Sequence, residues 1–200
     1  MKKSIITLSR EFGSRGRYIG ELLADKIGYK IYDREISLRV AEISSLDPEF
    51  IEMQGERAAS KSVFSFAFAG RTMDGQSVDD VVFNAQQKVI REIAEEGNCI
   101  IIGRNSDYIL RDRDDVMHVF IYGNDPEKIQ YCKDFCDARS DREAMAMIKE
   151  MDKKRALNYQ YYTDQKWGAK ENYDILLNSS TYGYEGCADI LAKLLSIKRK

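Results

Sequence analysis

Residues 4–18 read Ser-Ile-Ile-Thr-Leu-Ser-Arg-Glu-Phe-Gly-Ser-Arg-Gly-Arg-Tyr, in which a short β-branched, apolar run leads into a polar segment rich in glycine. The next apolar residues recur at the spacing of one helix face: Ile19, Leu22, Leu23 and Ile27. Gly28 follows at the position where a left-handed residue often ends a helix. The pattern predicts a strand over Ser4–Leu8, a loop over Glu11–Arg17 and a helix that ends before Gly28.

The same alternation of strand and helix patterns recurs along the rest of the chain. Short apolar runs predict further strands at Tyr29–Tyr32, Asn98–Ile102, Val116–Tyr122 and Tyr173–Asn178. Helical patterns are found at 36–43, at 78–96, from 125 to about 137, from 140 through 151, and in a closing segment up to 195. Parallel neighbouring strands need a crossover, which a helix supplies. The sequence therefore predicts an α/β fold with a five-stranded parallel sheet and helices on both faces.

Length and composition exclude several classes of protein. Two hundred residues with 44% hydrophobic and 32% charged residues fit one globular domain with a real core. A net charge of −2 lacks the basic excess of a duplex nucleic-acid binder, so no nucleic-acid partner is expected. Apolar stretches such as Cys99–Ile102 are far shorter than the roughly 18 residues that a membrane span needs, so no membrane partner is expected. Arg10 and Glu11 come before any signal-peptide core develops, and we expect a cytoplasmic protein.

Cysteine and histidine usage is consistent with this expectation. Four cysteines, at 99, 132, 136 and 187, are too few and too scattered for a secreted disulfide framework. Cys132 and Cys136 are spaced to share one side of a helix. His118, the single histidine of the sequence, lies in a strand-like run. Because a structural zinc ion usually needs four nitrogen or sulfur ligands, a zinc site is disfavoured.

The loop after the first strand has the composition of a phosphate-binding loop. Its residues are Gly13, Ser14, Arg15, Gly16, Arg17 and Tyr18. In such loops, glycines let backbone N–H groups turn inward, a helix N-terminus adds positive charge, and a cationic side chain reaches the terminal phosphates. Compared with G-x-x-x-x-G-K-[ST], Gly16 and Arg17 take the places of glycine and lysine, while Glu11 and Tyr18 depart from the pattern. The alternative is an ordinary glycine-rich connection.

Three polar clusters follow predicted strands, at Ser9–Arg17, Asp33–Arg39 and Gly103–Asp107. Ligands of parallel α/β sheets gather beyond the carboxyl ends of the strands, so these clusters should meet at one edge. The second cluster could also be a solvated helix start, with acidic residues in the first turn. Arg104, directly after a buried strand, is the stronger signal, because a cation aimed at that edge favours an anionic ligand there.

These segments resemble the cytidylate kinase-like branch of P-loop nucleoside monophosphate kinases over about residues 4–195. The matching segments are Ser9–Arg17, Tyr32-Asp33-Arg34-Glu35, Ile102-Gly103-Arg104, Asp152-Lys153-Lys154-Arg155, and Trp167-Gly168 followed by Tyr173-Asp174. The resemblance implies a P-loop NTPase-type sheet in a single kinase-like domain spanning 1–200. Its core would be about 1–35, 78–124 and 169–200, with a helical acceptor-binding insertion at about 36–77 and a lid at about 125–168.

The resemblance also implies an activity and roles for residues. The activity is an ATP-dependent transfer of the γ-phosphoryl group to a nucleoside monophosphate or a similar acceptor, with Mg²⁺. Gly13–Tyr18 would hold the donor phosphates, with Arg17 also catalytic. Asp33, Arg39, Arg104 and Asp152 would bind the substrate, Asp33 also orienting the acceptor for reaction. Asp152 and Arg155 match a D-x-x-R on the lid, whose arginine closes over the transfer.

Departures from the family pattern keep a second reading open. Ile102 and Asn105 stand where D-G-R-D has aspartates, and Tyr18 replaces the small hydroxyl that usually holds Mg²⁺. The metal ligands and the acceptor are therefore not assigned by sequence. The alternative to an active kinase is a catalytically weak or inactive nucleotide-binding or regulatory protein on the same fold.

Two groups of aromatic residues have more than one interpretation. Phe64, Phe66 and Phe68 alternate as in a strand; they suggest ordinary packing, or a ligand or partner surface that would make a homo-oligomer. The other group lies near the end of the lid and consists of Tyr159, Tyr161, Tyr162 and Trp167. It would either stack on a base or pack the lid against the body, and packing is the favoured interpretation.

Overall fold

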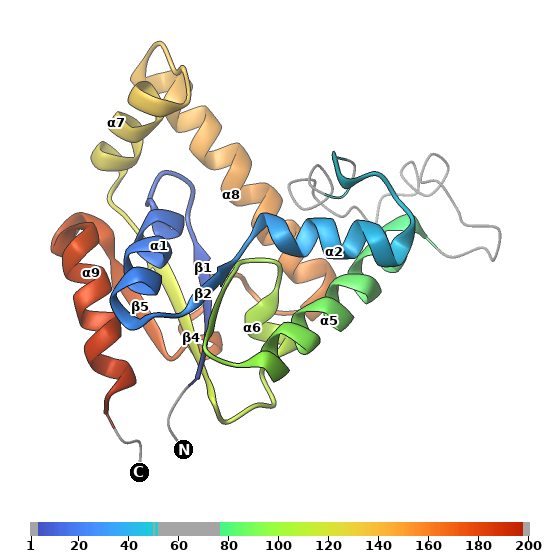
Figure 1. Cartoon of the computed structure of the whole chain (residues 1–200). Coiled ribbons are helices and arrows are strands. Elements are labelled where there is room, and N and C mark those ends of the chain that lie inside the picture. The colour runs from blue at the N-terminus through green and yellow to red at the C-terminus, as the bar shows by residue number, and fades with distance from the viewer. Residues whose placement is uncertain (1–3, 50, 52–76, 198–200) are drawn as a thin grey trace.

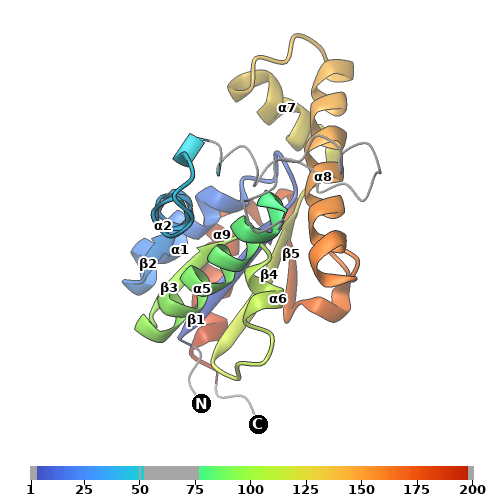
Figure 2. The same ribbon diagram turned by 90° about the vertical axis from the view of Figure 1, so that its right-hand side faces the viewer.

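The computed structural model describes residues 4–49, 51 and 77–197. Within them, five parallel strands form one sheet in the order β2-β3-β1-β4-β5 (Figures 1 and 2). The strands are β1 (Ile5–Arg10), β2 (Lys30–Tyr32), β3 (Cys99–Ile102), β4 (Val116–Tyr122) and β5 (Ile175–Asn178). Each of the five strands was predicted from the sequence, and the α/β class is confirmed. The first strand extends two residues beyond the prediction because Ser9 and Arg10 still pair with β4.

Helices cover both faces of the sheet (Figures 1 and 2). Their bounds are α1 (Gly16–Ile27), α2 (Arg34–Ser44), α5 (Val78–Glu96), α6 (Ser106–Ile109), α7 (Asp125–Phe135), α8 (Asp141–Thr163), the 3₁₀ turn η1 (Lys170–Asn172) and α9 (Ser179–Leu195). One core lies between the sheet and α1 with α9, and a second lies between the sheet and α2, α5 and α6. The alternating side chains of β1 serve both cores: Ile5 faces the second and Ile6 the first.

Helices α7 and α8 form an arm that projects beyond the sheet (Figure 1). The capping pattern that predicted the start of α8 is present, since Ser140 Oγ accepts a hydrogen bond from the Glu143 N–H at 3.2 Å. A small apolar cluster that includes Cys132, Ala144 and Ile148 joins the two helices. The sequence predicted this helix only as far as Met151, but α8 continues for another three turns (Figure 2).

The second half of α8 is anchored to the body of the protein by its aromatic residues. The ring of Tyr162 stacks on Phe83 of α5, with centroids 3.9 Å apart. The hydroxyl of Tyr159 donates to the buried Asp107 carboxylate at 2.7 Å. Beyond the helix, Trp167 packs edge-on against Phe120 of β4 at 5.1 Å. These contacts favour the packing interpretation of the aromatic group.

Some sequence-based predictions fall outside the described residues. Phe64, Phe66 and Phe68, most of the expected acceptor-binding insertion and the basic residues 198–200 belong there. In the described ranges, no helix combines the length and apolar character needed to cross a bilayer.

Candidate functional site

The loop between β1 and α1 lies at the carboxyl edge of the sheet and presents the N-terminus of α1. Its turn uses left-handed backbone at Gly13 (φ 80°) and at Arg15 (φ 55°), which immediately precedes the first helical residue, Gly16. Ser14, almost fully buried, donates from Oγ to the Glu11 carbonyl at 2.8 Å. The polar, glycine-rich segment thus has a defined conformation that points helix N–H groups toward the edge.

Two arginines from separate segments of the chain reach one carboxylate. Arg17, in the first turn of α1, places Nη1 3.4 Å from Asp33 Oδ2. Arg104, after β3, places Nη2 3.8 Å from Asp33 Oδ1. Asp33 itself directly follows β2. The three polar clusters expected to meet at the carboxyl edge therefore each contribute one of these side chains.

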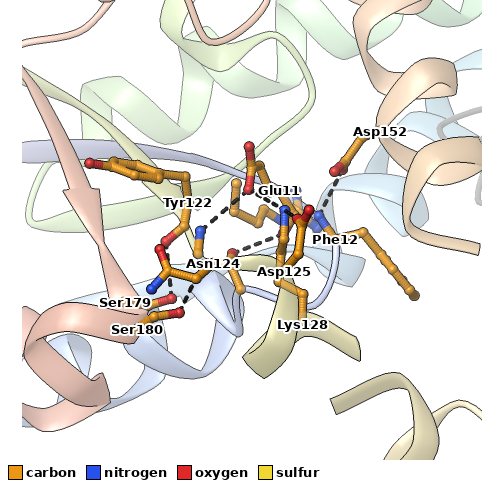
Figure 3. Close-up of polar contacts among 12 residues, drawn as sticks. Glu11, Phe12, Tyr122, Asn124, Asp125, Lys128, Asp152, Ser179 and Ser180 are labelled. Atoms are coloured by element: carbon orange, nitrogen blue, oxygen red, sulfur yellow. Dashed lines mark hydrogen bonds and ion pairs between the residues drawn. The ribbon is translucent and has the colours of Figure 1, made fainter. Parts of the chain in front are cut away.

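Helix α8 brings a further arginine and a carboxylate to the same loop. Arg155 Nη1 donates to the backbone carbonyl of Arg10 at 3.0 Å and lies 3.5 Å from Asp152. Asp152 Oδ1 accepts a hydrogen bond from the backbone N–H of Phe12 at 2.7 Å (Figure 3). Burial raises the pKa of Asp152 to about 6, against the opposing effects of the Phe12 N–H and Arg155. The arm thus contacts the loop through the D-x-x-R pair.

Arg10, the last residue of β1, also belongs to this site and was not among the predicted site residues. The largest influence on its guanidinium is burial, which with nearby Arg155 lowers the Arg10 pKa to about 10. Asp33 acts in the opposite direction, while Arg104 and Arg17 lower the pKa further. The sequence did carry a signal, because a strand continued past Leu8 places Arg10 on the same face as Ile6 and Leu8, toward α1.

The structure directs Arg15 away from this group. Its guanidinium lies over four aromatic rings, at 4.6 Å from Tyr18, 5.1 Å from Tyr184, 5.1 Å from Phe135 and 5.6 Å from Tyr131. These rings come from α1, α9 and α7. Arg15 therefore links three helices by cation–π contacts.

Arg39 also lies apart from the Asp33 group. Its Nη2 is 2.7 Å from Glu35 and its Nη1 is 3.3 Å from Glu96, the last residue of α5. The guanidinium sits over the ring of Tyr32 at 5.5 Å. The hydrogen bond that Arg39 donates to Glu35 raises the pKa of Arg39, with burial opposing this effect and the hydrogen bond to Glu96 adding to it. The Glu35–Arg39 spacing of four residues on a helix was visible in the sequence as an ion-pair signal.

A pocket of about 180 Å³ lies beside the loop, between α7 and α9. Its lining residues are Gly13, Ser14, Glu127, Lys128, Ser179, Ser180, Gly183 and Tyr184. Lys128 Nζ is held 2.9 Å from Glu11 and 3.2 Å from Asp125 (Figure 3). Burial opposes the charge of Lys128, but these two carboxylates raise its pKa overall. Glu11, a departure from the loop motif, therefore positions a cation at the pocket. No local pattern indicates this pair, because its two residues are 117 positions apart.

This chemistry fits a nucleotide better than a metal ion held by the protein. Arginines and Lys128 surround the loop, and the pocket offers an aromatic ring, Tyr184, beside hydroxyl groups. In the part of the chain that the structure describes, no three His, Cys, Asp or Glu side chains are grouped so as to hold a metal. Tyr18, at the Ser/Thr position of the motif, packs its ring edge-on against Tyr184 at 5.9 Å. Tyr18 therefore does not supply the small hydroxyl that usually holds Mg²⁺ at this position of the motif.

Comparisons with known proteins relate the whole chain to kinases. Residues 5–181 match the cytidylate kinase-like family. A cytidylate kinase of Archaeoglobus fulgidus is 23% identical over 199 residues, which cover 97% of this chain and 96% of that protein. An uncharacterized protein from Eubacterium ventriosum has a crystal structure with a TM-score of 0.73 at 23% identity, covering 98% of this chain and 100% of that one. A shikimate kinase from Bacteroides thetaiotaomicron shares the fold, with a TM-score of 0.55 at 15% identity and coverages of 97% and 99%.

Proposed function

The chain belongs to the cytidylate kinase-like family, and we propose that it moves the γ-phosphoryl group of ATP to a nucleoside monophosphate or a similar small phosphorylated acceptor. The broader assignment, a kinase-type phosphotransferase, follows from the family together with the kinase-like fold. ATP as donor, Mg²⁺ as its usual companion and the class of acceptor are parts of the proposal. So are a cytoplasmic location and the absence of nucleic-acid and membrane partners.

One observation carries this proposal: arginines from four separate segments meet at the carboxyl edge of the sheet. Arg17 and Arg104 share Asp33, and Arg155 contacts the backbone of Arg10. Phosphoryl transfer asks a protein chiefly to position two anionic groups and to stabilise charge on the equatorial oxygens. Guanidinium groups suit this task because their fork of donors matches phosphate oxygens.

The geometry supports a division of the site into a donor side and an acceptor side. On the donor side, the pocket beside Gly13 and Ser14 would take the nucleoside part of ATP, with its phosphates toward Arg17 and the N-terminus of α1. On the acceptor side, Arg104 would bind the acceptor phosphate, and Asp33 would orient it. Arg39 was also predicted on this side, but its contacts with Glu35 and Glu96 favour a structural role.

The arm formed by α7 and α8, within the predicted lid at about 125–168, would complete the site. Asp152 and Arg155 already contact the loop, so movement of α8 against α1 would bring Arg155 over the transferring group. Closure of such a lid excludes water, which otherwise competes as the acceptor. Bound Mg²⁺ would neutralise phosphate charge, while the residues named here bind and orient the two substrates.

The direct test is turnover of the purified chain with ATP, Mg²⁺ and a panel of cytidine, uridine, adenosine and guanosine monophosphates. We expect ADP formation that depends on at least one acceptor and falls about 100-fold in Arg17→Ala. Arg91→Ala, at an exposed position on α5, is the matched control and should keep full activity. The proposal would be contradicted if ADP forms without any acceptor, or if no ADP forms with any of the acceptors.

A nucleotide-binding protein without catalysis is the second candidate. Its motivation is Tyr18, which stands at the Ser/Thr position and turns its ring to Tyr184. Calorimetry with ATP separates the two candidates. Binding without turnover of any acceptor favours the second, and the absence of nucleotide binding contradicts both.

A further inference from the structure

We propose that Arg10 is a phosphate-binding residue of the reaction centre, and that its guanidinium contacts the phosphoryl group as it passes from the donor side at Arg17 to the acceptor side at Arg104. This inference rests on the proposed function and deepens it. It adds a cation from the end of β1, a position outside the G-x-x-x-x-G-K-[ST] pattern.

The course of the Arg10 side chain places it between the two sides of the site. A Cβ atom on Gly16, the first residue of α1, would lie 2.5 Å from Arg10 Cβ. A Cβ atom on Gly103 would overlap with Arg10 Nη1. The stem of the arginine therefore runs against the start of the donor helix, and its guanidinium lies against the residue before Arg104. Both neighbours are glycines, and any larger residue would displace this side chain.

The charged groups around Arg10 are mostly positive, which favours binding of an anion there. Arg17 and Arg104 have Asp33 as a partner, and Arg155 has Asp152. Among the residues that the structure describes, no carboxylate lies within 4 Å of the Arg10 guanidinium. Arg10 is only partly exposed to solvent. A cation that is partly withdrawn from water and has no close counter-charge is costly, and a bound anion relieves that cost. The lowered pKa of Arg10, caused by burial and by the other arginines, agrees with this deficit of negative charge.

Phosphate is the anion that this arrangement fits. Its oxygens can accept from several guanidinium groups at once, and each group here comes from a different segment of the chain. During transfer the charge is spread over three equatorial oxygens, which a set of converging donors stabilises. A competing explanation is that Arg10 only supports the backbone at Gly103, where φ is 63°. The experiment must separate these two roles.

The first experiment measures binding of inorganic tripolyphosphate by calorimetry at fixed ionic strength. We expect Arg10→Met to weaken binding at least tenfold and Arg10→Lys to weaken it less, because lysine keeps the charge and loses the fork. Arg91→Met, on the exposed face of α5, should bind as the wild type does. A folded Arg10→Met variant with wild-type affinity, or a wild-type chain that does not bind tripolyphosphate, would overturn the proposal.

Turnover adds a readout that a structural role would not produce. With ATP and an active acceptor, we expect kcat to fall at least 100-fold in Arg10→Met. This fall should exceed the rise in KM for ATP, and kcat should recover in part in Arg10→Lys. Equal kcat in the wild type and the Met variant would overturn the proposal. Failure of the wild type to use any acceptor would instead contradict the proposed function, while the tripolyphosphate measurement still decides the role of Arg10.

A crystal structure of the wild-type chain with tripolyphosphate covers the case in which the Met variant does not fold. Support requires an anion oxygen within hydrogen-bond distance of the Arg10 guanidinium. An anion held by Arg17 and Arg104, with Arg10 contacting protein groups only, would overturn the proposal.

Discussion

Asp152 accepts a hydrogen bond from the backbone N–H of Phe12 at 2.7 Å, although 140 residues separate the two along the chain. The contact ties the middle of α8 to the loop before α1 (Figure 3). Burial raises the pKa of Asp152 from the ordinary aspartate value of 3.8 to about 6. A carboxyl group whose pKa is higher in the folded state contributes stability below its unfolded pKa, and that contribution is lost as pH rises through the folded pKa.

Replacing this carboxyl group by an amide should therefore change the pH dependence of stability. We expect Asp152→Asn to exceed the wild type at pH 7 to 8 by about 1–3 kcal/mol in free energy of unfolding, with the difference shrinking as pH falls from 6 toward 4. Urea denaturation across this pH range measures it. Asp112→Asn, where the side chain is 83% exposed, is the control and should show no such trend. A difference that does not vary with pH would refute the assignment.

The contrast between Arg104 and Arg39 tests the division of the site. Arg104→Ala should lower kcat/KM for the acceptor by about 100-fold, because it removes a cation beside Asp33. Arg39→Ala should change that ratio by less than about threefold and should lower stability by ~1 kcal/mol, since it loses partly exposed ion pairs with Glu35 and Glu96. Steady-state kinetics with a varied acceptor decides the question. A loss at Arg39 as large as that at Arg104 would restore its predicted role in acceptor binding.

Arg15 should matter for packing more than for nucleotide affinity. Because its guanidinium lies over four rings, Arg15→Ala should lower the free energy of unfolding by about 1–2 kcal/mol. Its dissociation constant for ATP should rise less than fivefold, compared with a rise of at least tenfold in Arg17→Ala. Thermal denaturation and calorimetry on the same samples provide both values. If Arg15→Ala loses as much affinity for ATP as Arg17→Ala, the predicted role of Arg15 in phosphate binding would be supported instead.

The hydroxyl of Tyr159 should contribute measurably to the anchoring of α8. Tyr159→Phe leaves one oxygen of the buried Asp107 carboxylate without its donor, so we expect a loss of about 1–3 kcal/mol in free energy of unfolding. Tyr182→Phe, at a side chain that is 54% exposed, serves as the control and should change stability by less than about 0.5 kcal/mol. Equal stabilities of Tyr159→Phe and the wild type in urea would show that the hydrogen bond has no net effect.

Much of the fold was predictable because it depends on local patterns. Apolar runs marked each strand, helical spacing marked α1 and α5, and the match over residues 5–181 confirms the family resemblance drawn from five motifs. The meeting of Arg17, Asp33 and Arg104 was also predictable, since each follows a parallel strand. These inferences need only the position of a residue relative to a strand end.

The direction of long side chains was not predictable in the same way. Arg15, directly before α1, and Arg17, in the first turn of α1, are only two residues apart, but Arg15 has left-handed backbone and its side chain lies over the aromatic rings. Lys128 contacts Glu11 of the loop from α7, and no local pattern indicates a contact between residues 117 positions apart. Predicting Arg10 as a site residue required knowing where β1 ends, and the ends of such elements are among the least certain features of a sequence pattern.

Helix α8 is long and uninterrupted, and its aromatic anchor at Tyr159 lies near its C-terminal end. Its 23 residues span about 35 Å, and the tip at Asp141 lies about 27 Å from the anchor at Tyr159. A tilt of α8 by about 10° at this anchor would displace Asp141 by ~5 Å. Asp152, which is closer to the anchor, would be displaced less than half as far. A change of packing around Asp107 that tilted α8 would therefore displace the end of the helix at Asp141 more than the part that contacts the loop.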